Sequence, residues 1–327
     1  MYDLNQRLNH TPASHAGKKI SASRGKLLGD VTMKMVKKIL LGLVVCTTVL
    51  AFTGCKPPEA GNSEMISVSG SKGSIDYTNE SDTVISRGFK PMKTMHLDAI
   101  CQIQMTKNEL VGSEAGANGV MGYVFNLVED NDAETKSFSV AGIRYLQNKG
   151  LSAYVETFKD IPNADIETTS LSGVEATLSN GNIDSGFGKI IADKATVESK
   201  IKDNKLDVWI EVVANGKYKK ADGTFETPVG RDGDEGTYTV YFYLEDPKRD
   251  SSASNYDLKY NGTTTRPTPI ASATVASANV FNKYNSTKGL TSMQAYMGCY
   301  ANVYKKQHLT GTWKFSEIKK EAEEIEE

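Results

Sequence analysis

The sequence has few of the residues that build disulfide frameworks, metal centres and hydrolytic triads. Only 4 cysteines and 4 histidines occur in 327 residues, with no Cys-x-x-Cys pair and no Cys/His cluster. This excludes a disulfide-dense fold and leaves no spacing typical of a zinc site. A Gly-x-Ser-x-Gly motif is absent, which disfavours a serine hydrolase of that type, and no glycine-rich phosphate loop precedes a helix.

An excess of either charge is also lacking. Lys and Arg number 38 against 40 Asp and Glu, so nothing in the composition indicates a nucleic-acid partner. With 39% hydrophobic residues, 28 glycines and 9 prolines, the chain is neither collagen-like nor of low complexity. We therefore expect an ordinary globular protein.

An uncharged apolar stretch near the N-terminus indicates export. It covers residues 39–52, follows three lysines between positions 34 and 38, and ends shortly before Cys55. The stretch is too short to span a bilayer, which takes about 20 residues, but it suits the hydrophobic region of a secretory signal peptide.

This segment, which ends in Phe52, Thr53, Gly54 and Cys55, resembles the signal and lipobox of bacterial lipoproteins. In that family a signal peptidase cuts before the cysteine, whose thiol carries diacylglycerol. The resemblance therefore implies a covalent lipid on Cys55 and anchoring to a membrane. The family prefers leucine where Phe52 stands, and the alternative is a signal peptide with an incidental cysteine. By analogy with lipoprotein sorting in double-membrane bacteria, Lys56 after the anchor favours the outer membrane.

The lipobox fixes the expected domain organisation. Residues 1–32 are polar and without periodicity, which indicates a mis-assigned N-terminal extension. The signal peptide is then 33–54, and the lipidated tether, rich in Pro and Gly, is 55–66. One domain of about 250 residues follows at 67–318, and a charged tail closes the chain at 319–327.

Apolar and polar residues alternate with period two through much of the expected domain. Residues 206–212, 238–244 and 293–304 each alternate between a mainly apolar face and a face with polar and further aromatic side chains, which is typical of half-buried strands. Asn-Gly and Asp-Gly pairs between such segments favour hairpin turns. The pattern predicts an all-β fold, an antiparallel β-sandwich or jelly roll, with one short helix at Ile190–Lys202.

Two segments resemble concanavalin A-like and laminin-G-like sandwiches. One begins with Gly-Tyr-Val-Phe at residues 122–125, and the other begins with Gly-Cys-Tyr-Ala-Asn-Val-Tyr at residues 298–304. The resemblance implies the fold over about residues 95–318. It does not imply one function, because such folds host lectins, adhesive modules and glycoside hydrolases alike.

Two cysteines and two histidines remain in the expected mature domain. Cys101 and Cys299 lie on apolar faces. In the jelly rolls that this chain resembles, the first and last strands are neighbours, so a disulfide between these cysteines is one expectation. Two buried thiols are the other. His96 and His308 are expected on the surface, and no metal site is assigned to them.

The carboxylates do not form a pattern typical of catalysis. Asp207 and Glu211 share the outward face of one strand at about 13 Å, beyond the roughly 5–9.5 Å of a glycosidase pair. The acidic loops at 130–134 and 232–235 offer hard oxygens to Ca²⁺, without the spacing of an EF-hand. Ordinary solvated turns are the alternative there, and no catalytic residue is assigned.

Six aromatic residues on outward strand faces are the candidate ligand-binding residues: Trp209, Tyr241, Tyr243, Tyr296, Tyr300 and Tyr304. Flat rings on a strand face can stack on sugars or anchor a protein partner, provided that they share one concave, accessible face. The other interpretation is that they are structural cover. We predict non-catalytic binding of a glycan or protein. A glycoside hydrolase on the same scaffold and a purely structural envelope lipoprotein are the alternatives.

Lipid attachment at Cys55 is testable in a bacterial host. The mature chain is expected to begin at an acylated Cys55 and to fractionate with membranes, because each buried CH₂ contributes about 0.8 kcal/mol to anchoring. Cys55→Ser should abolish both properties, whereas Cys46→Ser, within the signal peptide, should leave them intact. Mass spectrometry of the mature N-terminus is the measurement, and an unmodified Cys55 contradicts the prediction.

Overall fold

The computed structural model describes the greater part of one compact unit. The described residues are 65–95, 98–107, 119–130, 132–162, 174–175, 178–179, 182–184, 188–250, 256–276, 285–290, 293 and 295–318. They all belong to the second of two units, 1–56 and 57–327. The signal peptide, Cys55, His96 and the tail at 319–327 lie outside them. No helix in the described ranges is long and apolar enough to cross a bilayer.

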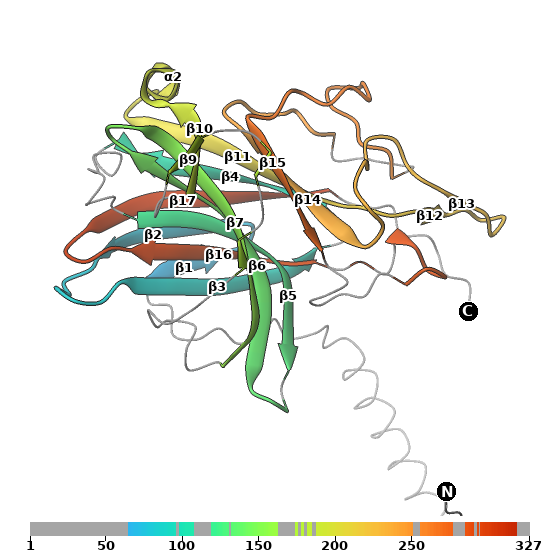
Figure 1. Ribbon diagram of the computed structural model, residues 1–327, viewed down its shortest axis with the longest axis horizontal. Coiled ribbons are helices and arrows are strands. Elements are labelled where there is room, and N and C mark those ends of the chain that lie inside the picture. The colour runs from blue at the N-terminus through green and yellow to red at the C-terminus, as the bar shows by residue number, and fades with distance from the viewer. Residues whose placement is uncertain are drawn as a thin grey trace, which may run out of the picture. The chain divides into compact units, whose positions relative to one another are not determined.

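Two antiparallel sheets make up this unit (Figure 1). Sheet A has the strand order β1 (Ile66–Ser69), β2 (Lys72–Thr78), β17 (His308–Ile318), β4 (Asp98–Thr106), β11 (Lys205–Ala214), β14 (Thr237–Tyr243) and β15 (Ala271–Ala276). Sheet B has the order β3 (Ser86–Met95), β16 (Ala295–Val303), β5 (Gly119–Asp130), β6 (Thr135–Leu146), β7 (Gly150–Pro162), β10 (Gly188–Asp193) and β9 (Asn182–Asp184), with β8 (Val174–Glu175) also paired to β7. A separate hairpin of β12 (Tyr218–Lys219) and β13 (Phe225–Glu226) projects from one end (Figure 1).

The predicted antiparallel β-sandwich is confirmed. Each sheet turns one apolar face toward the other, and these faces form a single core that excludes water. The alternation works as expected along β11, where Leu206, Val208 and Ile210 are 0% exposed while Asp207 and Trp209 lie on the opposite face. The strand order places β11 and β4 at the centre of sheet A.

One α-helix occurs among the described residues, and it is shorter than predicted. It is α2, Lys194–Lys200, whereas the expected helix began at Ile190. That residue belongs to β10, which pairs with β7. The helix begins after Asp193, whose side chain accepts a hydrogen bond from the Thr196 backbone N–H at 2.9 Å. Strand pairing and this N-cap together set the boundary, and apolar periodicity does not reveal either.

The two cysteines of the domain are free, buried thiols. They do not lie on neighbouring strands of one sheet, since Cys101 is in β4 of sheet A and Cys299 is in β16 of sheet B. Burial raises the pKa of both thiols well above the usual value, so neither is reactive as a thiolate. The alternative of two packed thiols describes this form of the protein, and a bridge between them stays a prediction.

Trp313 ties the two sheets together at the centre of the sandwich. It lies in β17 of sheet A and is 0% exposed, and its Nε1 donates to the carbonyl of Gly122, in β5 of sheet B, at 2.8 Å. Packing around it is tight, because a Cβ added to Gly73 would lie 2.4 Å from Sγ of Cys299 and 3.2 Å from Cε3 of Trp313. The indole therefore fills space in the core and also forms a hydrogen bond between the two sheets.

Replacing this indole should weaken the fold. Trp313→Phe removes the donor to the Gly122 carbonyl and leaves a cavity, so we expect the free energy of unfolding to fall by about 2–3 kcal/mol. Phe225→Leu, at a position that is 41% exposed on β13, should change it by less than about 0.5 kcal/mol. Urea unfolding of both variants is the measurement, and equal stabilities would contradict the role of Trp313.

Candidate functional site

The six candidate aromatic residues do not share one face. Trp209 lies on β11, and Tyr241 and Tyr243 lie on β14, all in sheet A. Tyr296 and Tyr300 belong to β16 in sheet B, and Tyr304 follows that strand directly. The expectation of a single aromatic platform is therefore wrong, because strand alternation gives a face within one sheet and does not say which sheet a strand joins. The side chain of Tyr296 lies outside the described part.

On sheet A, two of these aromatic side chains are covered by the chain itself. Tyr241 and Tyr243 are 9% and 3% exposed, and the guanidinium of Arg266 lies 3.7 Å from the centroid of the Tyr241 ring. Together with Leu258 and Tyr260 they form a small apolar cluster on the outer side of the sheet. Structural cover is the correct interpretation for both tyrosines, and Trp209, at the edge of this cluster, stays partly exposed.

Glu211 lies at the centre of the covered region. Its carboxylate accepts hydrogen bonds from Arg249 at 2.9 Å, Arg266 at 2.8 Å, Tyr260 at 3.0 Å and Tyr243 at 3.0 Å. The residue is 0% exposed, although it lies on the outward face of its strand. Two guanidiniums and two phenols occupy its oxygens, so the carboxylate is not free to transfer a proton to a ligand.

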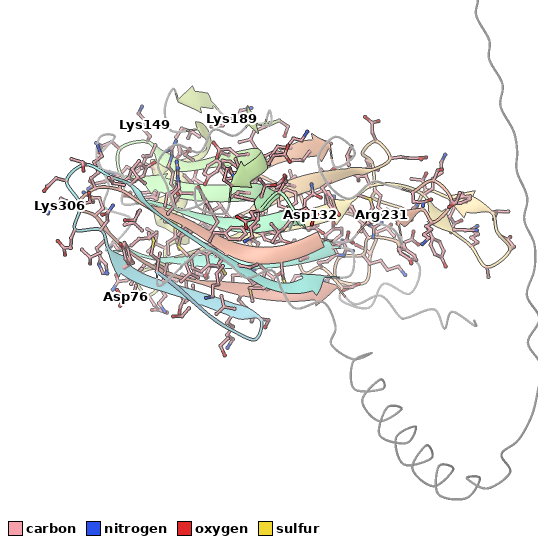
Figure 2. All side chains as sticks on the ribbon, turned by 90° about the horizontal axis from the view of Figure 1, so that it is seen from below. Asp76, Asp132, Lys149, Lys189, Arg231 and Lys306 are labelled. Carbon is pink, nitrogen blue, oxygen red and sulfur yellow. The ribbon has the colours of Figure 1, made fainter. Side chains whose placement is uncertain are left out.

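A second buried carboxylate, that of Asp98, extends this cluster. Asp98 forms a bidentate pair with Arg231 at 2.9 Å for each oxygen, and it also accepts from Arg249 at 3.1 Å. Burial raises the pKa of Asp98, but the two guanidiniums outweigh burial and hold it below the usual value. We call Asp98, Glu211, Arg231, Arg249 and Arg266 the ion network. Figure 2 shows Arg231 among the yellow and orange elements, away from Lys306.

The rest of the outer face of sheet A is open and polar. Its side chains form two rows that run across neighbouring strands in register. The first row consists of Lys72, Lys314, Gln102 and Trp209, and the second consists of Ser74, Thr312, Gln104 and Asp207. With strands about 4.8 Å apart, each row spans roughly 14 Å. All eight side chains are exposed or half-buried.

Two adjoining hollows follow these rows. One has a volume of about 480 Å³ and lies over β1, β2 and the centre of β17. The other has a volume of about 350 Å³ and is bounded by Trp209 and by Asp246, Lys248, Arg249 and Asp250. Gln102 and Lys314 line both hollows, so the two form one depression. We call this depression and its two rows the sheet A groove.

The groove has a preorganised hydrogen-bonding centre. Asp207 accepts from Nε2 of Gln102 at 3.1 Å and from Nε2 of Gln104 at 2.9 Å. Each amide keeps a carbonyl oxygen and a second N–H for a ligand, and the Trp209 indole offers a flat apolar surface beside them. The sequence analysis placed Trp209 and Asp207 on this face but missed both glutamines, although the alternation in residues 99–105 places them outward.

No metal centre is formed in the described residues, where no three His, Cys, Asp or Glu side chains converge. Asp132 and Glu134 of the first acidic loop are exposed, while the side chain of Asp130 lies outside the described part. His308 is exposed, as expected, and pairs with Asp76, Nε2 lying 2.7 Å from Oδ1. Binding of Ca²⁺ at the acidic loops stays a prediction.

Comparison with known proteins adds little to this geometry. No protein-family model matches the chain, and no curated protein matches it. Seven chains of solved structures are similar. One of them is a double mutant of the alginate lyase Aly36B in complex with an alginate tetrasaccharide, with a TM-score of 0.30, 6% sequence identity, and coverage of 80% of this chain and 87% of that chain. A TM-score this low carries no argument about the site.

The ion network should make stability depend on pH in a defined direction. Because the pKa of Asp98 is lowered by folding, its contribution is present above the unfolded pKa of about 4 and is lost as the pH falls through the folded value. Asp98→Asn should therefore cost about 3–5 kcal/mol at pH 7, and this difference should shrink below about pH 4.

Urea unfolding at pH 7, 5 and 3 measures this effect. Asp82→Asn is the matched control, because Asp82 is exposed and should change the free energy of unfolding by less than about 0.5 kcal/mol at each pH. A stability difference for Asp98→Asn that is the same at pH 7 and pH 3 would contradict the charge-paired state of this carboxylate.

Proposed function

We propose that this protein is an envelope-anchored bacterial lipoprotein whose β-sandwich binds a glycan, without catalysis, in the sheet A groove. One observation carries the proposal. Two adjoining hollows share Gln102 and Lys314, and amides, hydroxyls and the Trp209 indole line them. This combination of convergent polar groups and a flat apolar ring is what recognition of a small polar ligand requires.

The chemistry of the groove fits a sugar. A saccharide presents hydroxyl groups at its edge and C–H groups on its faces, so it needs paired donors and acceptors next to an aromatic surface. Gln102 and Gln104, oriented by Asp207, supply donors and acceptors, and Trp209 pairs directly with Gln102 across β11 and β4. A row of roughly 14 Å is long enough for more than one sugar ring.

Two features favour binding over hydrolysis. A glycosidase needs one protonated and one ionised acid on either side of the bond that it cleaves. Glu211 is enclosed by the ion network, and Asp207 already accepts from two amides.

A protein ligand is less well matched to the groove than a glycan is. Hollows of about 350 and 480 Å³ are of the size that holds small molecules.

The expected tether directly precedes a strand that lines the groove. The expected tether at 55–66 leads into β1 (Ile66–Ser69), and Ser67 and Ser69 of that strand line the larger hollow. In the proposed arrangement, acyl chains on Cys55 hold the protein at the outer membrane and the sandwich binds glycan beside it. The membrane and the glycan are its proposed partners, and no cofactor is part of the proposal.

The groove can be tested by glycan binding with the full chain. On an array of neutral oligosaccharides, Trp209→Ala and Gln102→Ala should each weaken binding of the best ligand at least tenfold, equivalent to about 1.4 kcal/mol. Phe225→Ala, at an exposed position on β13 of the separate hairpin, should bind as the wild type does. Binding that is unaffected by Trp209→Ala contradicts the site, and release of reducing ends from the ligand would favour the hydrolase.

A further inference from the structure

The outer face of sheet B carries a polar cluster that the groove on sheet A does not involve. The strand alternation places Arg144 on β6, Tyr154 on β7 and Tyr300 on β16 on this face, opposite the core residues of the same strands. Asn302 and Tyr304 follow Tyr300 on the same side. We call these five residues the sheet B cluster. No residue of it contributes to the ion network.

Two glycines form the surface on which this cluster rests. Gly122 and Gly142 lie directly opposite each other in the pairing of β5 with β6. The ring of Tyr154 lies across Gly142, where an added Cβ would come within 2.4–2.6 Å of Cζ, Oη and Cε1, and Tyr300 Cδ1 would lie 3.3 Å from a Cβ on Gly122. Both phenol rings can lie against the sheet because the two glycines have no side chains.

The cluster contains buried polar atoms that have no hydrogen-bond partner. Among them are the hydroxyl of Tyr154 and Oδ1 of Asn302, both shielded from solvent. Tyr154 is 8% exposed and so is more than nine-tenths buried. Buried polar groups are nearly always hydrogen-bonded in native proteins, and an exception points to strain, a ligand or an ion. The neighbouring phenol of Tyr304 does have a partner, because its oxygen accepts a hydrogen bond from Nη1 of Arg144 at 3.1 Å.

The charges around these atoms favour a negatively charged group. Arg144 acts electrostatically on Tyr154 and Arg87 acts on Tyr300, while Glu156 is the acid that acts on both tyrosines. Burial raises the pKa of Tyr154 well above the usual value, so its phenol is a neutral hydrogen-bond donor at physiological pH. Arg87, Glu156 and Asn302 are partly exposed, and a ligand therefore has access at the rim of the cluster.

We infer that the sheet B cluster is a second ligand site, which binds the carboxylate of an acidic sugar. The Tyr154 hydroxyl donates to a carboxylate oxygen, the Arg144 guanidinium balances its charge, and Oδ1 of Asn302 accepts from a hydroxyl of the same sugar. A carboxylate next to hydroxyl groups is the simplest ligand that satisfies a partnerless donor and a partnerless acceptor beside a cation. This site is independent of the proposed function, because the groove lies on the other sheet.

Calorimetric titration of the full chain tests the inference. The probes are trimers of galacturonic acid and of glucuronic acid, the neutral trimers of galactose and glucose, and acetate. We expect at least one acidic trimer to bind at least tenfold more tightly than its neutral counterpart. Tyr154→Phe should weaken that binding at least fivefold, and Asn302→Ala should also weaken it. Trp209→Ala should leave it unchanged.

A stability measurement separates loss of ligand from loss of fold. Tyr154→Phe removes a hydroxyl that has no partner, so the unfolding midpoint without ligand should stay the same or rise. Tyr304→Phe is the matched control, since it removes a hydroxyl bonded to Arg144 and should lower the midpoint.

Four results would overturn the inference: no binding of either acidic trimer, equal affinity of Tyr154→Phe and wild type, loss of acidic-trimer binding in Trp209→Ala, or acetate binding as tightly as the trimers. Failure of the neutral glycans in the groove would not affect it.

Discussion

Arg249 is the residue on which the arrangement of sheet A depends. Its guanidinium bonds Glu211 of β11 and Asp98 of β4 at once, so a single buried cation joins the two central strands to the connection between β14 and β15. A buried cation of this kind is tolerated only when carboxylates compensate its charge, and Arg249 has one on each terminal nitrogen. The same pairing holds residues 246–250 at one wall of the groove, so a stabilising element also shapes the proposed binding surface.

The outer faces of the two sheets differ in how their polar side chains are hydrogen-bonded. On sheet A, the buried acids are saturated by arginine and tyrosine, and the open part presents amides and hydroxyls that are already oriented by each other. On sheet B, aromatic rings lie on a glycine surface and leave a phenol and an amide oxygen without partners. The first arrangement favours a rigid, hydrated surface, and the second favours a surface completed by another molecule.

Much of the fold follows from the sequence, because period-two alternation reports the environment of each strand directly. Leu206, Val208 and Ile210 are buried as the pattern requires. Alternation cannot report which strands share a sheet, and this is why Trp209 and Tyr300 were expected together although they lie on different sheets. Glu211 shows a second limit, since its arginine partners are 38 and 55 residues away in the chain and no local pattern indicates them.

The facing glycines of β5 and β6 have a consequence for finding relatives of this protein. Aromatic residues on a sheet can be exchanged for one another with little change in shape, but an alanine at Gly142 would collide with the ring of Tyr154. Glycine at both positions should therefore persist in evolution for as long as the tyrosines lie flat on the strands. Two glycines paired in register on adjacent strands are thus a more selective signature of this surface than the tyrosines themselves.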